Sequence, residues 1–294
     1  MLDFTCNICA ARNRRERSEL TREGASCSSC GSSVRIRSLV RALSMELFGV
    51  AIPLVHLPRI KSLRGLGMSD THSYADHLAR KFDYRNTFWG RPPHFDLTNP
   101  GSEHTGKYDF VLSSEILEHV APPVDQAFRN VLDMLTDTGV LVMTVPYSVE
   151  EKMTEHYPDL YEYGFVRLGE TTALVNATRT GEVQVFRHPV FHLESARSAV
   201  EMREFTENDL TQIISAAGFV DVRIHSDDDP EFGIVHQETW SLPITARKRA
   251  AVLRLDSARE LLEEWRDLSG KFHGEMTRLN TSIWFRIGRK LGLL

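Results

Sequence analysis

The sequence lacks a long apolar run. No stretch approaches the roughly 20 apolar residues that cross a bilayer as a helix, and the start, Met1–Cys6, has no basic segment followed by an apolar one. We therefore expect neither a transmembrane helix nor a signal peptide, and we expect a cytoplasmic protein. A strong charge of one sign is also missing, since the net charge is −5 over 294 residues, which argues against wholesale wrapping by nucleic acid.

Cysteine is scarce, and all four cysteines lie in the first 30 residues. They form two Cys-x2-Cys pairs, Cys6 with Cys9 and Cys27 with Cys30, separated by seventeen residues. Two such turns can offer four thiolates to one tetrahedral zinc ion. Disulfides are the alternative, but thiols stay reduced in the cytosol. Because four thiolates leave no open position on the metal, we expect a structural zinc ion that supplies much of the module's folding energy.

The N-terminal segment is basic, although the whole chain is acidic. Residues 1–45 carry eight arginines against four carboxylates, a net charge of +4. This favours either a solvated basic surface or a contact surface for an anionic partner, such as a nucleotide sugar, a phospholipid or RNA. Apolar residues at helical spacing then predict a helix over residues 34–48, which joins this module to the next domain.

Two short apolar runs, one that follows Asp109 at residues 110–112 and one at residues 139–146, predict strands with a helix between them. Fully apolar strands joined in this way are typical of a parallel βαβ unit. Ligands bind beyond the carboxyl ends of such strands, and a polar group of residues directly follows the first run. Its members are Ser113, Ser114, Glu115, Glu118 and His119.

Further segments extend the α/β pattern. We expect a first strand at residues 61–66, with Gly65-x-Gly67-x-Ser69-Asp70 as its turn, since glycine lets the backbone approach a ligand closely. A helix is expected at 74–82 and a strand at 83–89. A later helix over 203–219, with Thr206 as N-cap and Gly218 as C-cap, leads into a strand at 220–224.

The Glu-His-Val after one strand, the Gly-Val-Leu strand and the Ala-Gly-Phe helix end resemble class I S-adenosylmethionine (SAM) dependent methyltransferases, from about residue 61 to 224. The resemblance implies an α/β fold with a Rossmann-like, seven-stranded sheet. It also implies SAM as cofactor, bound by Gly65, Gly67, Ser69, Asp70, Trp89, Asp96, Ser113, Ser114 and Glu115.

Two of these positions have two interpretations each. Many relatives have a carboxylate after the second strand that holds the ribose, whereas this chain has Trp89, which either stacks on adenine or fills the core. Asp96 matches an acidic residue that receives the adenine amino group, or it is a helix-cap or turn aspartate.

The Glu115-x-x-Glu118-His119 element predicts the catalytic groups. His119 is a candidate general base for an acceptor hydroxyl, together with Glu118 and His192. The element is also similar to that of Mg-dependent O-methyltransferases, including small-RNA 2′-O and ubiquinone-pathway enzymes. That similarity implies a second possibility, in which Glu115, Glu118 and His119 bind Mg²⁺ and lower the pKa of the acceptor hydroxyl.

The expected organisation has four parts: a zinc-binding module at residues 1–33, a linker helix at 34–50, a methyltransferase domain at 51–246 and a C-terminal helical extension at 247–294. An insertion at 147–200, rich in Tyr and His, is expected on the acceptor side. The extension has apolar residues at near-heptad spacing and a basic, aromatic end. It would pack on the core, mediate self-association, or lie on the inner membrane as a peripheral anchor.

The combination resembles bacterial methyltransferases of surface-polysaccharide or glycolipid assembly. It implies SAM-dependent O-methylation of a sugar hydroxyl, with a glycan or nucleotide sugar as partner and no nucleic acid. One alternative is a zinc-containing RNA methyltransferase, which the basic first 45 residues favour. The other is a non-catalytic scaffold with the SAM fold in a glycan-assembly complex, which the altered motifs of the first two strands favour.

Overall fold

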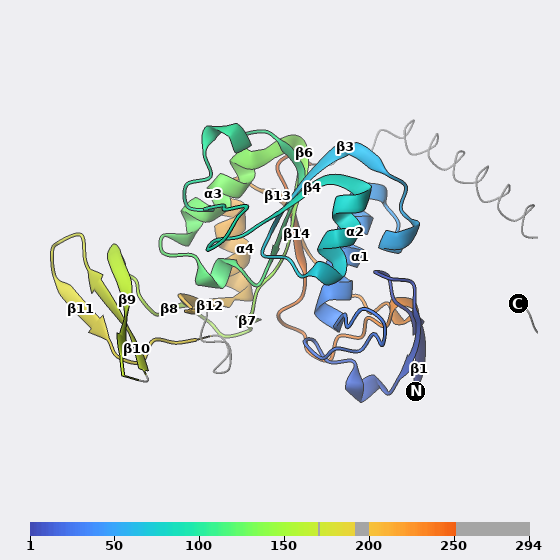
Figure 1. Ribbon diagram of the computed structural model, residues 1–294, viewed down its shortest axis with the longest axis horizontal. Helices are drawn as coiled ribbons and strands as arrows, with labels where there is room; N and C mark the ends of the chain where they lie inside the picture. Colours follow the sequence, from blue (N-terminus) through green and yellow to red (C-terminus); the bar gives the residue numbers. More distant parts are fainter. Residues whose placement is uncertain (170, 192–199, 251–294) are drawn as a thin grey trace, which may run out of the picture. The chain divides into compact units, whose positions relative to one another are not determined.

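A six-stranded sheet forms the centre of the protein, with the strand order β13-β14-β6-β5-β3-β4 (Figure 1). The computed structural model describes residues 1–169, 171–191 and 200–250. The strands of this sheet are β3 (Ile60–Met68), β4 (Phe82–Thr87), β5 (Tyr108–Ser114), β6 (Leu135–Thr144), β13 (Val220–Ile224) and β14 (Ile244–Arg247).

The four strands β4, β3, β5 and β6 run parallel, whereas β14 runs antiparallel between β6 and β13. The βαβ unit predicted from the two apolar runs is confirmed: β5 and β6 pair with Leu112 opposite Val142, and a helix connects them. A mixed sheet with a parallel centre and crossover helices is a Rossmann-like α/β fold.

The expected seventh strand is not formed in the part of the chain that the structure describes. Residues around Asp96 make an isolated parallel bridge, Phe88 with His94, in place of a strand. Two prolines, Pro92 and Pro93, precede this point and lack the N–H that a sheet ladder needs. The sheet therefore ends at β4, with a loop along its edge.

Helices cover both faces of the central sheet (Figure 1). On one face α1 and α2 pack through residues such as Leu39 and Leu78 against Phe110, while on the other α3 and α4 pack through Phe128 and Ile214. The helix predicted at 34–48 is confirmed. The helices are α1 (Val34–Phe48), α2 (His72–Lys81), α3 (Val124–Met134) and α4 (Glu207–Ala216), with 3-10 turns η1 (Arg17–Glu19), η2 (Leu54–His56), η3 (Ser102–His104), η4 (Leu117–His119) and η5 (Pro230–Phe232).

The predicted N-cap of α4 is confirmed, because the Thr206 hydroxyl accepts from the backbone N–H of Asp209. The predicted start of that helix at Arg203 is wrong. Residues Arg203–Thr206 form strand β12 instead, and the helix begins at Glu207. β12 pairs with β7 (Tyr147–Ser148) on one side and β8 (Thr154–Glu155) on the other.

The N-terminal module is joined to the α/β core by a shared apolar cluster. Its strands β1 (Leu2–Thr5) and β2 (Arg12–Arg15) form a hairpin. Cys6 and Ile8 belong to the same buried cluster as α1 and Phe110. Arg37 of α1 is fully buried and donates to the carbonyls of Ser32 and Gly233. The module is therefore packed into the unit Met1–Ala250.

The insertion carries a second antiparallel sheet of β9 (Glu162–Leu168), β10 (Thr171–Ala177) and β11 (Val183–Phe186), which extends outward in Figure 1. Among the tyrosines and phenylalanines of the insertion, Tyr147 and Tyr157 are buried, Phe186 and Phe191 are partly buried, and Tyr161, Tyr163 and Phe165 are exposed. Across the described ranges, no helix is long and apolar enough to span a bilayer. Except for residues 247–250, the expected C-terminal extension lies outside the described residues.

Candidate active site

The two central strands end in the same unusual backbone conformation. Ser69 follows β3 with φ = 58°, and Glu115 follows β5 with φ = 55°. Their strands are neighbours, since Met68 pairs with Ser113. A left-handed conformation is uncommon for residues other than glycine, and such strain gathers at functional sites. The backbone therefore leaves the sheet at the carboxyl ends of both β3 and β5. The sequence predicted a ligand site at this edge.

The predicted glycine turn is shifted along the chain. Gly65 and Gly67 lie inside β3, and the turn begins only at Ser69. A Cβ atom at Gly65 would overlap the ring of Phe110, and one at Gly67 would overlap the hydroxyl of Tyr84. The two glycines therefore make room for large side chains of the neighbouring strands. Their predicted contact with a cofactor stays a prediction.

Asp70 follows Ser69 at the carboxyl end of β3, and its side chain is buried. Its carboxylate accepts hydrogen bonds from the hydroxyls of Tyr74, at 2.6 Å, and Tyr84. The side-chain amide of Asn86 exchanges two hydrogen bonds with the Asp70 backbone, at 2.9 and 2.8 Å. Burial raises the pKa of Asp70 to about 7, against the opposite effect of the two hydroxyls. Asp70 thus ties β3, α2 and β4 together at the site.

Two arginines reach the same edge, Arg22 from the N-terminal module and Arg35 from the first turn of α1. Arg22 donates to both carboxylate oxygens of Glu115, at 2.9 and 3.3 Å. Arg35 donates to the hydroxyl of Ser114 and bonds Glu23 at two points, at 2.8 and 2.9 Å. The sequence indicated only a basic segment and missed both contacts, because no local pattern links residues so far apart in the chain.

Glu118 and His119 form a close pair on η4. The Glu118 side chain is 1% exposed, and one of its oxygens lies 3.6 Å from Nε2 of His119. Burial, together with the carboxylates of Glu115 and Glu201, raises the pKa of Glu118 well above its usual range. Because Nδ1 of His119 lies 2.9 Å from the carbonyl oxygen of Val200, Nδ1 carries a proton. In the neutral ring, Nε2 is therefore the basic atom.

The chain returning from the insertion fixes this pair in place. Met202 donates its N–H to the Glu118 carbonyl at 2.8 Å, and Arg203 donates to the Leu117 carbonyl at 2.7 Å. Arg203 is fully buried and also bonds Glu155 at 2.6 Å. With the Val200 contact, three consecutive residues of η4 are held by residues 200–203. His192, the third predicted catalytic residue, lies outside the described residues.

The remaining predicted cofactor residues have different environments. Trp89 is 63% exposed just beyond β4, so it does not fill the core. Asp96 accepts from the backbone N–H and the hydroxyl of Thr98, which is the turn arrangement that was its alternative interpretation. Ser113 is buried, and its hydroxyl has no hydrogen-bond partner among the described residues. The predicted contact of this hydroxyl with the cofactor stays a prediction.

The four cysteines converge as the spacing predicted. Their sulfur atoms all lie within 4.8 Å of one another. Cys6 and Cys30 are 3.6 Å apart at sulfur, as are Cys9 and Cys27. A disulfide would need about 2.0 Å, whereas tetrahedral Zn–S bonds of about 2.3 Å place sulfurs roughly 3.8 Å apart. The donor set therefore fits a closed four-thiolate zinc site.

The structure does not bring Glu115, Glu118 and His119 together as one group of metal donors, and the predicted Mg²⁺ site stays a prediction. Within residues 1–169, 171–191 and 200–250, the four cysteines are the one group of three or more acidic, His or Cys donors that converge on a point. The reason is that Glu115 turns toward Arg22, whereas Glu118 is buried beside His119. The backbone of residues 115–119 is not the helical turn that would bring Glu115 and Glu118 together.

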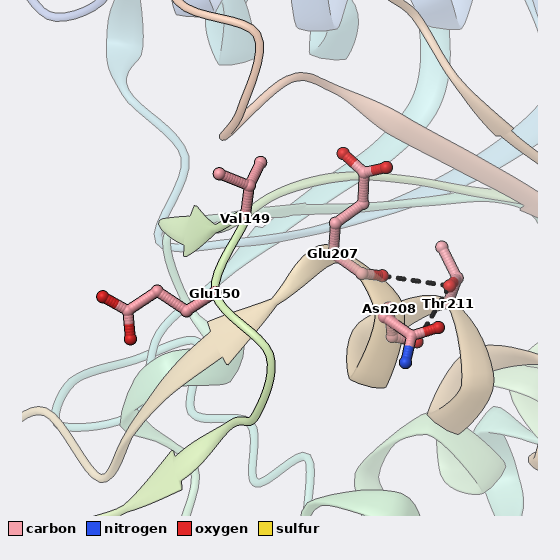
Figure 2. Close-up of a pocket in the computed structure, with 5 residues that line it drawn as sticks. All are labelled: Val149, Glu150, Glu207, Asn208 and Thr211. Carbon is pink, nitrogen blue, oxygen red and sulfur yellow. Dashed lines mark hydrogen bonds between the residues drawn. The ribbon is translucent and has the colours of Figure 1, made fainter.

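A separate pocket of about 280 Å³ opens between the loop after β7 and the start of α4 (Figure 2). In Figure 2 the Glu150 side chain points away from Asn208 and Thr211, and the Thr211 hydroxyl bonds the Glu207 and Asn208 carbonyls within α4. The pocket is lined by none of the predicted site residues. Its polar groups do not converge on a common point, so we place the candidate active site at Glu115–His119.

No family model matches the chain, and no curated protein matches it in sequence. Among solved structures, it is similar to the sugar N-methyltransferase KedS8 of Streptoalloteichus, with 15% identity, 76% of this chain and 89% of that chain covered, and a TM-score of 0.42. A SAM-dependent methyltransferase of Mesorhizobium loti shows 15% identity, 74% and 100% coverage, and a TM-score of 0.41.

The 1,6-didemethyltoxoflavin-N1-methyltransferase of Burkholderia thailandensis, solved with S-adenosylhomocysteine, shows 16% identity, 72% and 78% coverage, and a TM-score of 0.38. Such distant similarities leave the function to be argued from the site.

Proposed function

We propose that this protein is a SAM-dependent O-methyltransferase that modifies a sugar hydroxyl of a surface polysaccharide, a glycolipid or a nucleotide sugar. The observation that carries the proposal is the His119–Glu118 pair at the carboxyl end of β5. A histidine with one nitrogen fixed by a carbonyl and the other beside a buried carboxyl group is suited to remove a hydroxyl proton.

The strand ends fit SAM by the chemistry of their groups. Ser113 offers a buried hydroxyl that lacks a partner within the described ranges. Trp89 offers an exposed aromatic face for adenine. The turns at Ser69 and Glu115 leave the carboxyl edge of the parallel sheet at the place where ligands of this fold bind.

When bound, SAM supplies a methyl group on a positively charged sulfur, open to in-line displacement by an oxygen. His119 accepts the hydroxyl proton on Nε2 while Nδ1 stays bonded to Val200. The positive charge that develops on the ring lies 3.6 Å from an oxygen of Glu118. The partial negative charge of that oxygen stabilises the imidazolium, and Glu118 keeps its own proton in this step. Exposed Tyr161, Tyr163 and Phe165 supply stacking faces for a sugar.

The RNA alternative is weaker than the composition indicates. Of the eight arginines in the first 45 residues, Arg22, Arg35, Arg37 and Arg41 have largely covered side chains that bond other groups of the protein. These contacts reduce the basic surface that is open to a phosphate backbone.

Calorimetry with SAM and S-adenosylhomocysteine, followed by transfer from methyl-labelled SAM to nucleotide sugars, glycolipid and RNA, tests the proposal. We expect binding, and transfer to a sugar that is lost in His119→Ala. An absence of binding at high micromolar ligand overturns the proposal. Transfer to RNA alone would establish the first alternative, and binding without transfer to any acceptor would favour the scaffold.

A further inference from the structure

A carboxylate of the N-terminal module occupies a cradle made by two arginines at the edge of the candidate site. The Glu23 carboxylate bridges Arg22 and Arg35, and it meets Arg35 at two points, at 2.8 and 2.9 Å. The Arg35 side chain is only 16% exposed, and that of Arg22 is 26% exposed. Two largely buried guanidinium groups in this arrangement form a ready binding site for a carboxylate.

Glu23 is the more exposed of the two acidic residues at this cradle. Its side chain is 56% exposed, whereas that of Glu115, the second acidic partner, is 15% exposed. Water solvates the Glu23 carboxylate when it leaves, and an incoming ligand carboxylate takes its place on the two arginines. A ligand carboxylate can therefore replace Glu23.

A second carboxylate, that of Glu115, lies beside the two arginines of the cradle. Glu115 lies 2.9 Å from Arg22 and 3.9 Å from Arg35, and the Arg35 guanidinium also bonds the Ser114 hydroxyl. A ligand that carries a carboxylate and an ammonium group on one carbon matches this pairing of charges. The free amino-acid end of SAM is such a group.

We propose that Arg22 and Arg35 bind the α-carboxylate of SAM in the place of Glu23, and that Glu115 accepts from its α-ammonium group. The inference rests on the proposed function and assigns part of the cofactor site to the cysteine module. The module is tied to the first turn of α1 at this point, since the N–H of Arg35 bonds the Arg22 carbonyl at 3.0 Å. Glu23 then acts as an internal competitor of the cofactor.

Calorimetry with two ligands tests this assignment. S-adenosylhomocysteine carries the amino-acid end, and 5′-methylthioadenosine lacks it. We expect Arg35→Met to weaken S-adenosylhomocysteine binding about tenfold or more and to change 5′-methylthioadenosine binding less than about twofold. Arg35→Lys keeps the charge but loses the two-point contact. Its affinity for S-adenosylhomocysteine should therefore lie between those of the wild type and Arg35→Met. Arg14→Met, in the same module and paired with Asp3, is the matched control and should change neither affinity.

Glu23→Gln gives a result of opposite sign. Removal of the competing carboxylate should tighten S-adenosylhomocysteine binding by a few-fold and leave 5′-methylthioadenosine binding unchanged. Glu19→Gln in the same module is its control. Equal effects on both ligands, or no effect of Arg35→Met on S-adenosylhomocysteine, overturn the assignment. If the wild-type protein binds neither ligand, the proposed function itself fails. Zinc content and the circular dichroism spectrum verify that each variant is folded, and Arg22→Lys repeats the test if Arg35→Met does not fold.

Discussion

Arg22 donates to both carboxylate oxygens of Glu115, across 93 residues of sequence. The contact joins a small cysteine-rich module to the residue that ends the central strand β5. Both side chains are largely buried, so the pair holds the module against the carboxyl edge of the sheet. A cysteine cluster that fits zinc and a candidate catalytic site are thus connected through this ion pair and through the contacts of Arg35 with Ser114 and Glu115.

His119→Ala should lower the rate of methyl transfer by about 10²–10⁴-fold, which is the usual contribution of a general base. Since His119 acts on the acceptor proton, the affinity for S-adenosylhomocysteine should stay within about twofold of the wild-type value. Single-turnover transfer and calorimetry measure the two quantities. His104→Ala is the control, because His104 stacks on Tyr108 and the proposal gives it no part in the chemistry. A His119→Ala rate close to the wild-type rate would remove His119 from the mechanism.

Asp70 should make the protein less stable as the pH rises. Its pKa is raised from 3.8 to about 7 by burial, so the folded state binds the proton more tightly than the unfolded chain. This contribution to stability is present below about pH 4 and is lost as the pH rises toward 7. Three pKa units correspond to about 4 kcal/mol.

Urea unfolding at pH 5, 6, 7 and 8 measures this effect in the wild-type protein and in Asp70→Asn. The free energy of unfolding of the wild type should fall relative to that of the variant between pH 5 and 7 and then level off. The difference between two pH values is the quantity to use, because Asn also changes the hydrogen bonds with Tyr74 and Tyr84. A constant difference across the range would show that the pKa of Asp70 is not raised.

Much of the central fold can be predicted from short stretches of the sequence. The apolar runs on either side of α3 predict two parallel strands because both faces of such strands are buried. The helix at residues 34–48 is predictable from the spacing of its apolar residues. The N-cap of α4 is predictable from the hydroxyl of Thr206. The convergence of the four cysteines is also predictable, since two Cys-x2-Cys pairs are the spacing that a tetrahedral zinc site needs.

The contacts that complete the site could not be predicted in this way. The Gly65-x-Gly67 pattern looks like a turn, but these glycines are required by Phe110 and Tyr84, which belong to other strands. The Val200 carbonyl that fixes the His119 ring is 81 residues away in the sequence. Contacts of this kind depend on tertiary packing, which no local pattern encodes.

Gly67→Ala should destabilise the protein by about 1–3 kcal/mol, because the new methyl group would overlap the Tyr84 hydroxyl and the Asp70 carboxylate. The double variant Gly67→Ala/Tyr84→Phe should recover part of this loss, since it removes one of the two overlapping groups. Gly164→Ala is the matched control, because no atom of the described residues lies within 4 Å of the added methyl group. It should change stability by less than about 0.5 kcal/mol. Equal effects at Gly67 and Gly164 would contradict the packing role.

Zinc removal should unfold the cysteine module and also weaken cofactor binding. Metal analysis should find one zinc ion per chain, and Cys9→Ser should lower both the zinc content and the melting temperature. Because Arg22 lies in this module and its carbonyl bonds Arg35 of α1, a variant that stays folded at low temperature should bind S-adenosylhomocysteine more weakly but 5′-methylthioadenosine with nearly unchanged affinity. Ser28→Ala, beside the metal turn but with no thiolate, is the control for stability. Full zinc content in Cys9→Ser would show that this thiolate is not a ligand, and equal weakening of both ligands would show that the module supports the whole sheet edge rather than the amino-acid end.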